Sequence, residues 1–406
     1  MKHLYIINNY CKASIYGIGT YIEQLSSGLL TKNIAVTIVI LDSTGNSIER
    51  KKIDGINYLY FPAIHIPKTE KGLRRYARNI SILLSLYVED SSSIIFQFNY
   101  SYHLFLSEAI RYRFPKSRII HVVHYFSWGN SLLGSAKNLL YIIQKENKNQ
   151  FEKEIYYDYL HERQFFQSTD ILVCLSPSAK DILAKIYQVP EKNIRYIANG
   201  LKDAGTKIND SNKRGLKKML GFDKQDLIIL FVGRLNPQKG TNCLIETFKR
   251  LVMSLPNAKL VIVGGAGQNL QQYQNMIYGY WKNIYVTGFL DKNKLLDFYQ
   301  IADVGILLSL HEQCSYVAIE MMMYGIPIIG TNAMGLTEMI PTICQIPIQD
   351  VRNNLTSNSS ILEKKIIEVV NNRYYYSQLC RRKYEEKYNL EMMIKQYMEV
   401  YHMRGA

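Results

Sequence analysis

The chain has 406 residues, more than a single hydrophobic core usually serves, so two domains are expected. Its hydrophobic content of 47% and charged content of 20% are typical of a soluble globular protein. The formal net charge of +15 is spread over both halves, which argues against a basic tail. It suits an acidic ligand, a membrane surface or nucleic acid, and charge alone does not choose among them.

The cysteines and the first residues bear on the compartment. The six cysteines are scattered and include no Cys-x-x-Cys pair, which argues against a zinc site or a disulfide scaffold and favours a reducing compartment. The start of the chain has the pattern of a strand and lacks the apolar core of a signal peptide. No run approaches the ~20 apolar residues that span a bilayer. We therefore expect a cytoplasmic protein.

Apolar, β-branched runs alternate with helical periodicity along the chain. Strands are predicted at Leu4–Asn8, Ala35–Leu41, Ile94–Phe98, Arg118–Val123, Ile171–Leu175, Ile194–Ile197, Leu227–Val232, Lys259–Val263, Ile284–Val286, Val304–Leu308 and Ile326–Ile329. Helices are predicted between most of them, for example at Gly19–Thr31, Gln150–Gln167, Thr241–Ser254 and Ser359–Asn372. This alternation predicts an α/β protein with parallel sheets covered by helices on both faces. The polar segment Leu201–Asp226 is predicted to link two doubly wound domains, 1–200 and 201–384, that face each other.

Glycines stand ahead of the first predicted helix. Gly17 and Gly19 would let backbone N–H groups approach a phosphate or a sugar closely. A dinucleotide-binding fingerprint would need a third glycine where Ile22 stands, although Asp42 could act as its ribose-binding acid. A dehydrogenase is therefore disfavoured without being excluded, and a helix N-terminus with convenient glycines is the plain alternative.

A basic amphipathic helix is predicted between residues 68 and 83. Its cations are Lys68, Lys71, Arg74, Arg75 and Arg78. Such a helix can lie on an anionic membrane, which would give peripheral contact at the inner membrane face. The alternative is an ordinary surface helix with an apolar inner face.

Charged or polar residues follow two later strands. His124 closes the run Arg118–Val123, where it could hydrogen-bond a substrate, and His121 points to the opposite face by strand alternation. Arg234 and Lys239 follow Leu227–Val232 and are bracketed by glycines. Arginine can fork onto two phosphate oxygens and lysine adds a point charge, so the pair could stabilise a departing diphosphate. For each of these residues a structural or solvated side chain is the alternative.

Two glutamates, Glu312 and Glu320, lie eight positions apart after the strand Val304–Leu308. If a helix begins near Ser315, its free N–H groups and positive dipole end form an anion site beside Glu312. Glu320, a little over one turn into the helix, could reach hydroxyl groups of the same ligand. A diphosphate joined to two sugars fits this layout.

Taken together, these motifs resemble a family 4 retaining glycosyltransferase of GT-B fold. They are Gly17-Ile-Gly19, His124, Asn199-Gly200, Gly233-Arg234, Lys239-Gly240, Gly264 to Gly267, Gly288, Glu312, Glu320, and Gly325-Ile-Pro327, in the expected order. The resemblance covers essentially the whole chain. It implies two Rossmann-like domains, an acceptor-side domain and a nucleotide-sugar donor domain, with a last helix at about 385–406 that packs back on the first.

The resemblance also implies roles for residues. Arg234 and Lys239 match the clamp on the donor diphosphate, Glu320 the ribose contact, and Glu312 the contact to the transferred sugar. His124 matches the histidine near the reacting end of that sugar. The other donor-binding positions are Gly17 and Gly19 over the diphosphate, Gly233, the segment Gly288, Phe289 and Leu290, and the backbone of Cys314, Ser315 and Tyr316.

The sequence departs from the family pattern in three places. The family usually has glycine where Ser315 stands, aspartate where Tyr125 stands and alanine where Met321 stands. The string around Glu312 is similar to a Bacteroidetes subgroup associated with peptide-maturation clusters.

The function expected from these residues is transfer of a sugar, with retention, from a nucleoside-diphosphate donor to a glycan, lipid-linked glycan or peptide. No Asp-x-Asp occurs in the sequence, so no metal cofactor is expected. One alternative is an inactive sugar-nucleotide-binding or membrane-scaffolding protein of the same fold. Nucleic-acid binding is the other, and no recognisable module for it is present.

Overall fold

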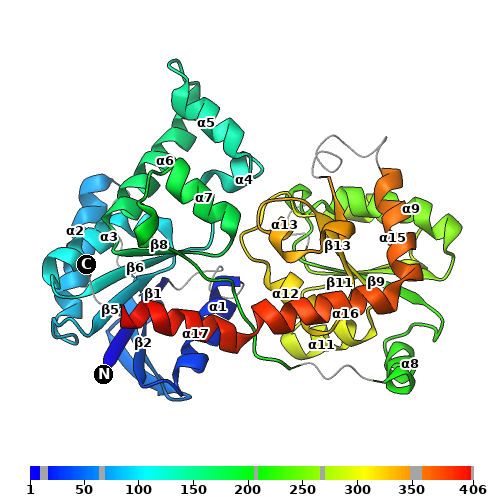
Figure 1. Ribbon diagram of the computed structural model, residues 1–406, viewed down its shortest axis with the longest axis horizontal. Coiled ribbons are helices and arrows are strands. Elements are labelled where there is room, and N and C mark those ends of the chain that lie inside the picture. Colours follow the sequence, from blue (N-terminus) through cyan, green and yellow to red (C-terminus); the bar gives the residue numbers. More distant parts are fainter. Residues whose placement is uncertain (10–16, 64–68, 205–208, 266–269, 348–358, 404–406) are drawn as a thin grey trace. The chain divides into compact units, whose positions relative to one another are not determined.

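The computed structural model describes residues 1–9, 17–63, 69–204, 209–265, 270–347 and 359–403. The chain divides into two compact units (Figure 1): unit 1 comprises Met1–Lys202 with Leu390–Ala406, and unit 2 comprises Asp203–Asn389. Each unit is built around one sheet, which confirms the predicted fold class of two Rossmann-like α/β domains. The helix that returns to unit 1 begins at Leu390, within the predicted range of about 385–406, and Tyr384–Tyr388 before it continue the preceding helix as a π-helical turn.

Unit 1 contains an eight-stranded sheet in the order β3-β4-β2-β1-β5-β6-β7-β8. Its strands are β1 (Lys2–Asn9), β2 (Ile34–Ser43), β3 (Glu49–Ile53), β4 (Ile56–Pro62), β5 (Ile94–Phe98), β6 (Arg118–Val123), β7 (Ile171–Cys174) and β8 (Ile194–Tyr196). The prediction of purely parallel sheets is wrong at one edge, where β3 pairs antiparallel with β4. The sequence signal for this hairpin is Asp54-Gly55, whose φ angles of 49° and 83° suit a tight two-residue turn. The charged, exposed β3 carries no apolar run that would mark it as a strand.

Helices pack on both faces of this sheet. They are α1 (Gly17–Leu29), α2 (Glu70–Leu84), α3 (Leu104–Arg113), α4 (Trp128–Ser131), α5 (Ala136–Gln144), α6 (Gln150–Ser168), α7 (Pro177–Lys185) and α17 (Leu390–His402). Phe96 and Phe98 of β5 belong to an apolar core with Phe114 and Phe165. Gln97 points the other way and bonds the hydroxyls of Tyr21 in α1 and Tyr401 in α17.

A buried arginine fixes the end of α17. The Arg118 guanidinium, at the start of β6, donates to the carbonyl oxygens of Val400 (3.3 Å), Met403 (2.6 Å) and Tyr401. A cation there satisfies carbonyls that a helix end leaves unpaired and complements the helix dipole. Nearer its start, α17 packs closely against α1, since a Cβ on Gly28 of α1 would lie 2.5 Å from the Ile394 side chain of α17.

Unit 2 contains a six-stranded parallel sheet in the order β11-β10-β9-β12-β13-β14. Its strands are β9 (Leu227–Val232), β10 (Ala258–Val263), β11 (Ile284–Gly288), β12 (Val304–Leu307), β13 (Ile328–Thr331) and β14 (Gln345–Ile346). Its helices are α8 (Asp210–Met219), α9 (Thr241–Ser254), α10 (Leu270–Ile277), α11 (Lys292–Ile301), α12 (Tyr316–Met323), α13 (Leu336–Met339), α15 (Ser359–Asn371) and α16 (Arg373–Lys383).

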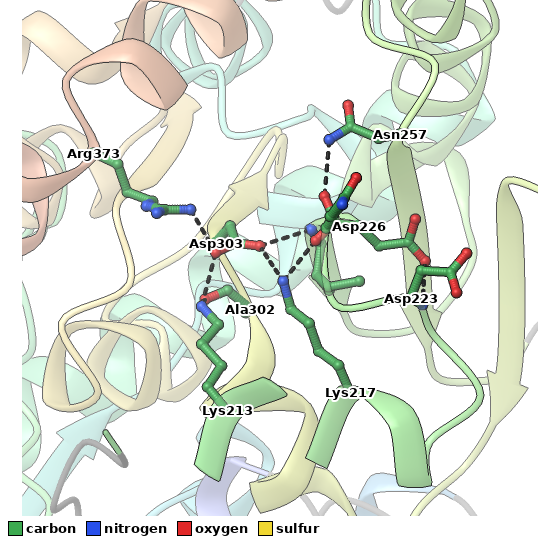
Figure 2. A network of polar contacts seen from close by, with 10 residues as sticks. Lys213, Lys217, Asp223, Asp226, Asn257, Ala302, Asp303 and Arg373 are labelled. Atoms are coloured by element: carbon green, nitrogen blue, oxygen red, sulfur yellow. Dashed lines mark hydrogen bonds and ion pairs between the residues drawn. The ribbon is translucent and has the colours of Figure 1, made fainter. Parts of the chain in front are cut away.

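Helix α8 lies inside the segment that was predicted to be a linker and the entry to the second domain. It is held by charge: Lys213 Nζ lies 2.7 Å and Lys217 Nζ 3.1 Å from the two carboxylate oxygens of buried Asp303 (Figure 2). Arg373 of α16 contacts the same carboxylate at 2.8 Å. An apolar stripe is not needed to dock such a helix, which is why hydrophobic periodicity did not reveal it.

Two further findings concern the described residues. None of their helices is both long enough and apolar enough to span a bilayer. The five cysteines among them, Cys174, Cys243, Cys314, Cys344 and Cys380, are buried free thiols. Cys11 lies outside the described residues.

Candidate functional site

In unit 2 the predicted donor-site residues follow two neighbouring strands. Strand β9 lies beside β12, and the chain order of the strands reverses between them. Ligands of open α/β sheets bind at such a reversal, beyond the carboxyl ends of the strands. Arg234 and Lys239 follow β9, and Glu312 follows β12. The two loops are joined directly, since the N–H of Leu310 donates to the carbonyl oxygen of Gln238 at 2.8 Å.

Lys239 and Glu312 form an ion pair through Nζ and Oε1. Both side chains are largely covered, with 27% of Lys239 and 18% of Glu312 exposed. Burial alone would raise the pKa of Glu312, but the Lys239 ammonium outweighs it and holds the pKa below its usual value. The carboxylate is therefore ionised at neutral pH and faces a fixed cation.

Local backbone geometry supports this pair. The Asn236 side chain accepts a hydrogen bond from the N–H of Lys239 at 3.0 Å, capping the short turn that carries the lysine. Gly240 has φ +66°, and a Cβ there would lie 2.4 Å from Leu308. A Cβ on Gly335 would lie 2.5 Å from the carbonyl oxygens of Glu312 and Gln313, so this glycine lets the loop after β13 pack against the Glu312 loop.

Arg234 differs from Lys239. Its side chain is exposed and makes no hydrogen bond or ion pair with the described part of the chain. Gly233, just before it, has φ +152°, and its carbonyl oxygen would be only 1.9 Å from a Cβ on Gly264. The exposed Arg234 side chain is therefore attached to a backbone segment that packs closely against Gly264.

Helix α12 begins as the sequence suggested. Ser315 is its N-cap, and the Oγ atom accepts from the N–H of Ala318 at 3.4 Å. The φ and ψ of Ser315, −72° and 118°, are ordinary for any residue, so glycine is not required there. Cys314 and Tyr316, on either side of it, are buried.

Glu320 lies in the second turn of α12. The hydroxyl of Tyr299 in α11 donates to its Oε2 at 2.6 Å. Burial raises the pKa of Glu320 above its usual value. Tyr299 was not singled out from the sequence, because the sequence of α11 does not indicate which side chain of α12 its tyrosine will contact.

The remaining donor-side prediction is the end of β11. Gly288 has φ +73°, and its carbonyl oxygen accepts from the N–H of Gly264 at 2.9 Å. Phe289 is 68% exposed and Leu290 is half-buried. Strands β10 and β9 separate β11 from β12, so these residues lie at a different place along the same sheet edge from Glu312. Gly267 lies outside the described residues.

Unit 1 holds the other predicted residues. Gly17 and Gly19 begin α1. His124 follows β6, and its Nε2 lies 3.1 Å from Oδ1 of Asn99, the residue after β5. Burial lowers the pKa of His124 to about 3, so its ring is neutral. His121 is buried and its ring packs edge-on against Phe165, on the opposite face of β6.

Two further polar residues of unit 1, Asn99 and Asp42, lie near strand ends. Asn99 was not predicted, although a polar residue directly after the apolar run Ile94–Phe98 was the available signal. Asp42, considered above as a ribose-binding acid, accepts hydrogen bonds from Asn9 Nδ2 (2.9 Å) and the Tyr76 hydroxyl (3.1 Å). Its carboxylate thus joins β1, β2 and α2.

The basic helix is α2, and its cations differ in their surroundings. Lys71, Arg75 and Arg78 are exposed. Arg74 instead bonds Glu70 and Glu108, each at 2.8 Å, and its guanidinium lies over the ring of Phe105. Lys68 lies outside the described residues. In the described parts of the chain, no cluster of three or more His, Cys, Asp or Glu side chains is arranged to hold a metal ion.

Two family models match the chain, one in each half. The model described as Glycosyltransferase Family 4 matches residues 15–204, and the model described as Glycosyl transferases group 1 matches residues 212–342. Residues 15–204 are thus similar to glycosyltransferases of family 4, and residues 212–342 to those of group 1. The gap between the two matches begins close to the unit boundary at Lys202 and Asp203 and contains the start of α8.

Curated relatives of this chain align over part of their length. An uncharacterized glycosyltransferase of Methanocaldococcus jannaschii is 32% identical over 173 residues, which are 42% of this chain and 44% of the relative. Mannosylfructose-phosphate synthase of Agrobacterium fabrum is 28% identical over 191 residues, 44% of this chain and 41% of the relative. The aligned part thus spans less than half the length of these two proteins.

Solved structures match the chain over nearly its whole length. Sucrose-phosphate synthase of Thermosynechococcus elongatus has a TM-score of 0.75 at 18% identity, covering 99% of this chain and 98% of that one. The HepE protein of Anabaena, solved with UDP and glucose, has a TM-score of 0.73 at 13% identity, covering 97% and 98%. At these identities the likeness establishes the fold, which is GT-B.

Proposed function

We propose that this chain is a retaining glycosyltransferase that moves a sugar from a nucleoside-diphosphate donor to an acceptor hydroxyl. The observation that carries the proposal is the arrangement at the reversal of strand order in unit 2. There Arg234 is exposed and has no anionic partner among the described residues. It follows the same strand as Lys239, which forms an ion pair with Glu312 from the neighbouring strand β12. A ligand with both phosphate and hydroxyl groups suits one free cation and one carboxylate–ammonium pair.

The reaction requires little covalent chemistry from the protein. The bond between the anomeric carbon and the diphosphate oxygen breaks, and its electron pair stays on that oxygen. The acceptor hydroxyl oxygen forms the new bond from the same face, and its proton passes to the departing diphosphate. Arg234 and Lys239 would stabilise the charge that develops on the leaving group, as fixed cations do in a covered site. With these two cations present, we expect no metal to be required.

Glu312 and Glu320 would then divide the remaining contacts. Glu320, pointing to the Tyr299 hydroxyl from the second turn of α12, would accept from the ribose hydroxyls. Glu312 would accept from hydroxyls of the transferred sugar once that sugar lies beside Lys239. The backbone around Cys314, Ser315 and Tyr316 would face sugar and phosphate, and Gly288, Phe289 and Leu290 would lie near the base.

In unit 1, Gly17 and Gly19 would approach the diphosphate and His124 the transferred sugar. The acceptor is proposed to be a glycan, a lipid-linked glycan or a peptide. A lipid-linked acceptor is used by one relative, UDP-Gal:α-D-GlcNAc-diphosphoundecaprenol α-1,3-galactosyltransferase of Escherichia coli, 24% identical over 57% of this chain. A UDP-linked donor is suggested by the same relative and by HepE, whose structure holds UDP and glucose.

We also propose that α2 contacts the membrane surface, where a lipid-linked acceptor would be located. Lys71, Arg75 and Arg78 recur at helical spacing, and Ile82, 40% exposed, continues the same stripe. Leu86, 70% exposed, extends it beyond the helix. Cations with exposed apolar side chains suit an anionic lipid surface. Binding to vesicles that contain anionic lipid, and its loss in Lys71→Glu/Arg75→Glu, would test this contact.

A panel of nucleotide sugars tests the proposal as a whole. A bound donor should raise the melting temperature, and the same donor should yield labelled product with an acceptor extract or labelled free sugar by slow hydrolysis. Stabilisation by a donor without transfer or hydrolysis would favour the inactive, sugar-nucleotide-binding alternative. If no donor stabilises the chain, the proposed function is wrong.

A further inference from the structure

Asn99 joins three neighbouring strands of unit 1 at the reversal of strand order. Strand β5 lies between β1 and β6, and Asn99 directly follows β5. On one side its Nδ2 donates to the carbonyl oxygen of Ile7 in β1 at 3.3 Å. On the other side its Oδ1 lies 3.1 Å from Nε2 of His124, the residue after β6. The side chain is 1% exposed, so these two contacts take the place of hydrogen bonds to water.

The contact to Ile7 fixes which way the amide points. A backbone carbonyl only accepts, so it must face the NH₂ group and not the oxygen of Asn99. Turning the amide over would place two oxygens opposite each other and leave a buried carbonyl and amide without their hydrogen bonds. The oxygen of Asn99 is therefore the atom that faces the histidine.

This orientation fixes the proton on His124. An amide oxygen only accepts, so Nε2 must carry the hydrogen and donate it. In a neutral imidazole the other nitrogen, Nδ1, then bears a lone pair. The ring itself is held by Tyr21 of α1, whose ring meets it edge-on with centroids 4.7 Å apart. Tyr21 is in turn fixed by Gln97 and Tyr397.

We infer that Asn99 is a positioning residue that holds His124 as the Nε2–H tautomer, so that Nδ1 accepts a hydrogen bond from a sugar hydroxyl. This inference rests on the proposed function for the identity of the ligand, but the tautomer follows from unit 1 alone. It assigns His124 a contact to hydroxyl and not to phosphate, because an unprotonated nitrogen repels a phosphate oxygen. The low pKa of His124 agrees with this, since a neutral ring is needed.

The test is the nitrogen NMR spectrum of the full chain labelled with ¹⁵N-histidine. The signals of His124 are identified by their loss in His124→Gln. In the wild type at neutral pH we expect a protonated Nε2 and an unprotonated Nδ1. In Asn99→Ala the two nitrogens should approach averaged shifts, as the tautomers mix. Asn8→Ala is the matched control: it removes a neighbouring buried amide, whose Oδ1 accepts from Tyr100 at 3.0 Å, and should leave the His124 signals unchanged.

Asn99→Asp provides a second readout in case the alanine variant does not fold. A carboxylate also accepts from Nε2 but favours the doubly protonated ring, which raises the pKa of His124. The other titratable neighbours of His124 are Tyr21, whose pKa is raised by burial, and His121 on the opposite face of β6, whose pKa burial lowers. Of these three groups, His124 is therefore the one expected to gain a proton at a higher pH in Asn99→Asp than in the wild type. Because a protonated Nδ1 cannot accept a hydrogen bond, transfer by Asn99→Asp should decrease as the pH is lowered from 8 to 5, more than transfer by the wild type does.

A protonated Nδ1 in the wild type, or wild-type signals in Asn99→Ala, would overturn the inference. If the chain transfers no sugar at all, the kinetic readout fails with the proposed function, whereas the tautomer is still measured. If transfer occurs and Asn99→Ala mixes the tautomers without lowering kcat/KM, the contact from Nδ1 to the sugar is wrong.

Discussion

At the scale of single residues, Arg234 is expected to contribute to ligand binding alone, whereas Lys239 is expected to contribute to both ligand binding and stability. Both were predicted to contact the diphosphate, yet only Lys239 has a carboxylate beside it in the structure. Removing Lys239 leaves the Glu312 carboxylate largely covered without its cation, which costs free energy of folding. Removing the exposed Arg234 leaves no such group behind.

We expect Arg234→Ala and Lys239→Ala each to lower kcat/KM on the order of 100-fold or more, the usual effect of losing one electrostatic stabiliser. Only Lys239→Ala should also lower the melting temperature. Arg214→Ala, an exposed arginine on α8, is the control and should change neither quantity. Near wild-type turnover in both variants would contradict the diphosphate clamp.

The two glutamates should differ in what they bind. Glu320→Gln removes the proposed ribose contact, so we expect it to weaken binding of the free nucleoside diphosphate. Glu312→Gln should affect that binding less and transfer more, because its contact belongs to the sugar. Calorimetry with the nucleoside diphosphate and kinetics with the full donor measure the two effects. Equal losses of nucleotide affinity would mean that these roles are wrongly divided.

At the scale of secondary-structure elements, apolar patterning determines how much could be predicted. Three predicted strands, Ile94–Phe98, Arg118–Val123 and Leu227–Val232, have the observed bounds, because continuous apolar runs mark strands buried on both faces. The run Leu227–Val232 also predicted the positions of Arg234 and Lys239 after a strand, and the run Val304–Leu308 predicted that of Glu312. Strand β3 and helix α8 were not predicted, since β3 is a charged strand at the edge of its sheet and α8 is held by ion pairs. Arg118 could not be recognised as a helix cap either, because its carbonyl partners lie some 280 positions away.

Helix α8 should depend on the Asp303 carboxylate, which meets Lys213, Lys217 and Arg373 (Figure 2). Burial alone would raise the pKa of Asp303, but the lysines outweigh it and lower the pKa below its usual value. Asp303→Asn leaves Lys217, 7% exposed, without an anion. We expect a loss on the order of 3–5 kcal/mol in the free energy of unfolding.

The pH dependence of this effect has a definite sign. A carboxyl with a lowered folded pKa stabilises the protein fully above its unfolded value, about 3.9, and loses that contribution as pH falls through the folded value. The difference between wild type and Asp303→Asn in urea unfolding should therefore be constant near neutrality and shrink below about pH 4. Glu246→Gln, which removes a more exposed ion pair with Lys249, should change stability by less than about 1 kcal/mol. An equal effect of the two variants would contradict the proposed anchor of α8.

At the scale of the whole molecule, both sheets reverse their strand order, and most of the predicted site residues lie after the strands next to each reversal or one strand away. The segment at Gly288, which follows β11, lies two strands away. In unit 1 the reversal falls between β1 and β5, and in unit 2 between β9 and β12. The doubly wound pattern could therefore be predicted together with the edge of each sheet that carries the candidate residues. The partners that hold them could not, because Asn99 with His124 and Tyr299 with Glu320 meet only through tertiary packing.

The absence of Asp-x-Asp and the presence of Arg234 and Lys239 lead to a joint prediction on metal and stereochemistry. If these cations stabilise the leaving diphosphate, chelation with EDTA should leave transfer nearly unchanged, whereas a metal-bridged donor would lose almost all activity. Retention means that an α-linked donor gives an α-linked product, and proton NMR of the anomeric signal in the first product reads this directly. The Arg234→Ala variant serves as the control, since partial rescue of that variant by added manganese would still agree with an electrostatic role for the arginine. An inverted linkage, or wild-type activity abolished by EDTA and restored by manganese, would overturn the mechanism while leaving the fold in place.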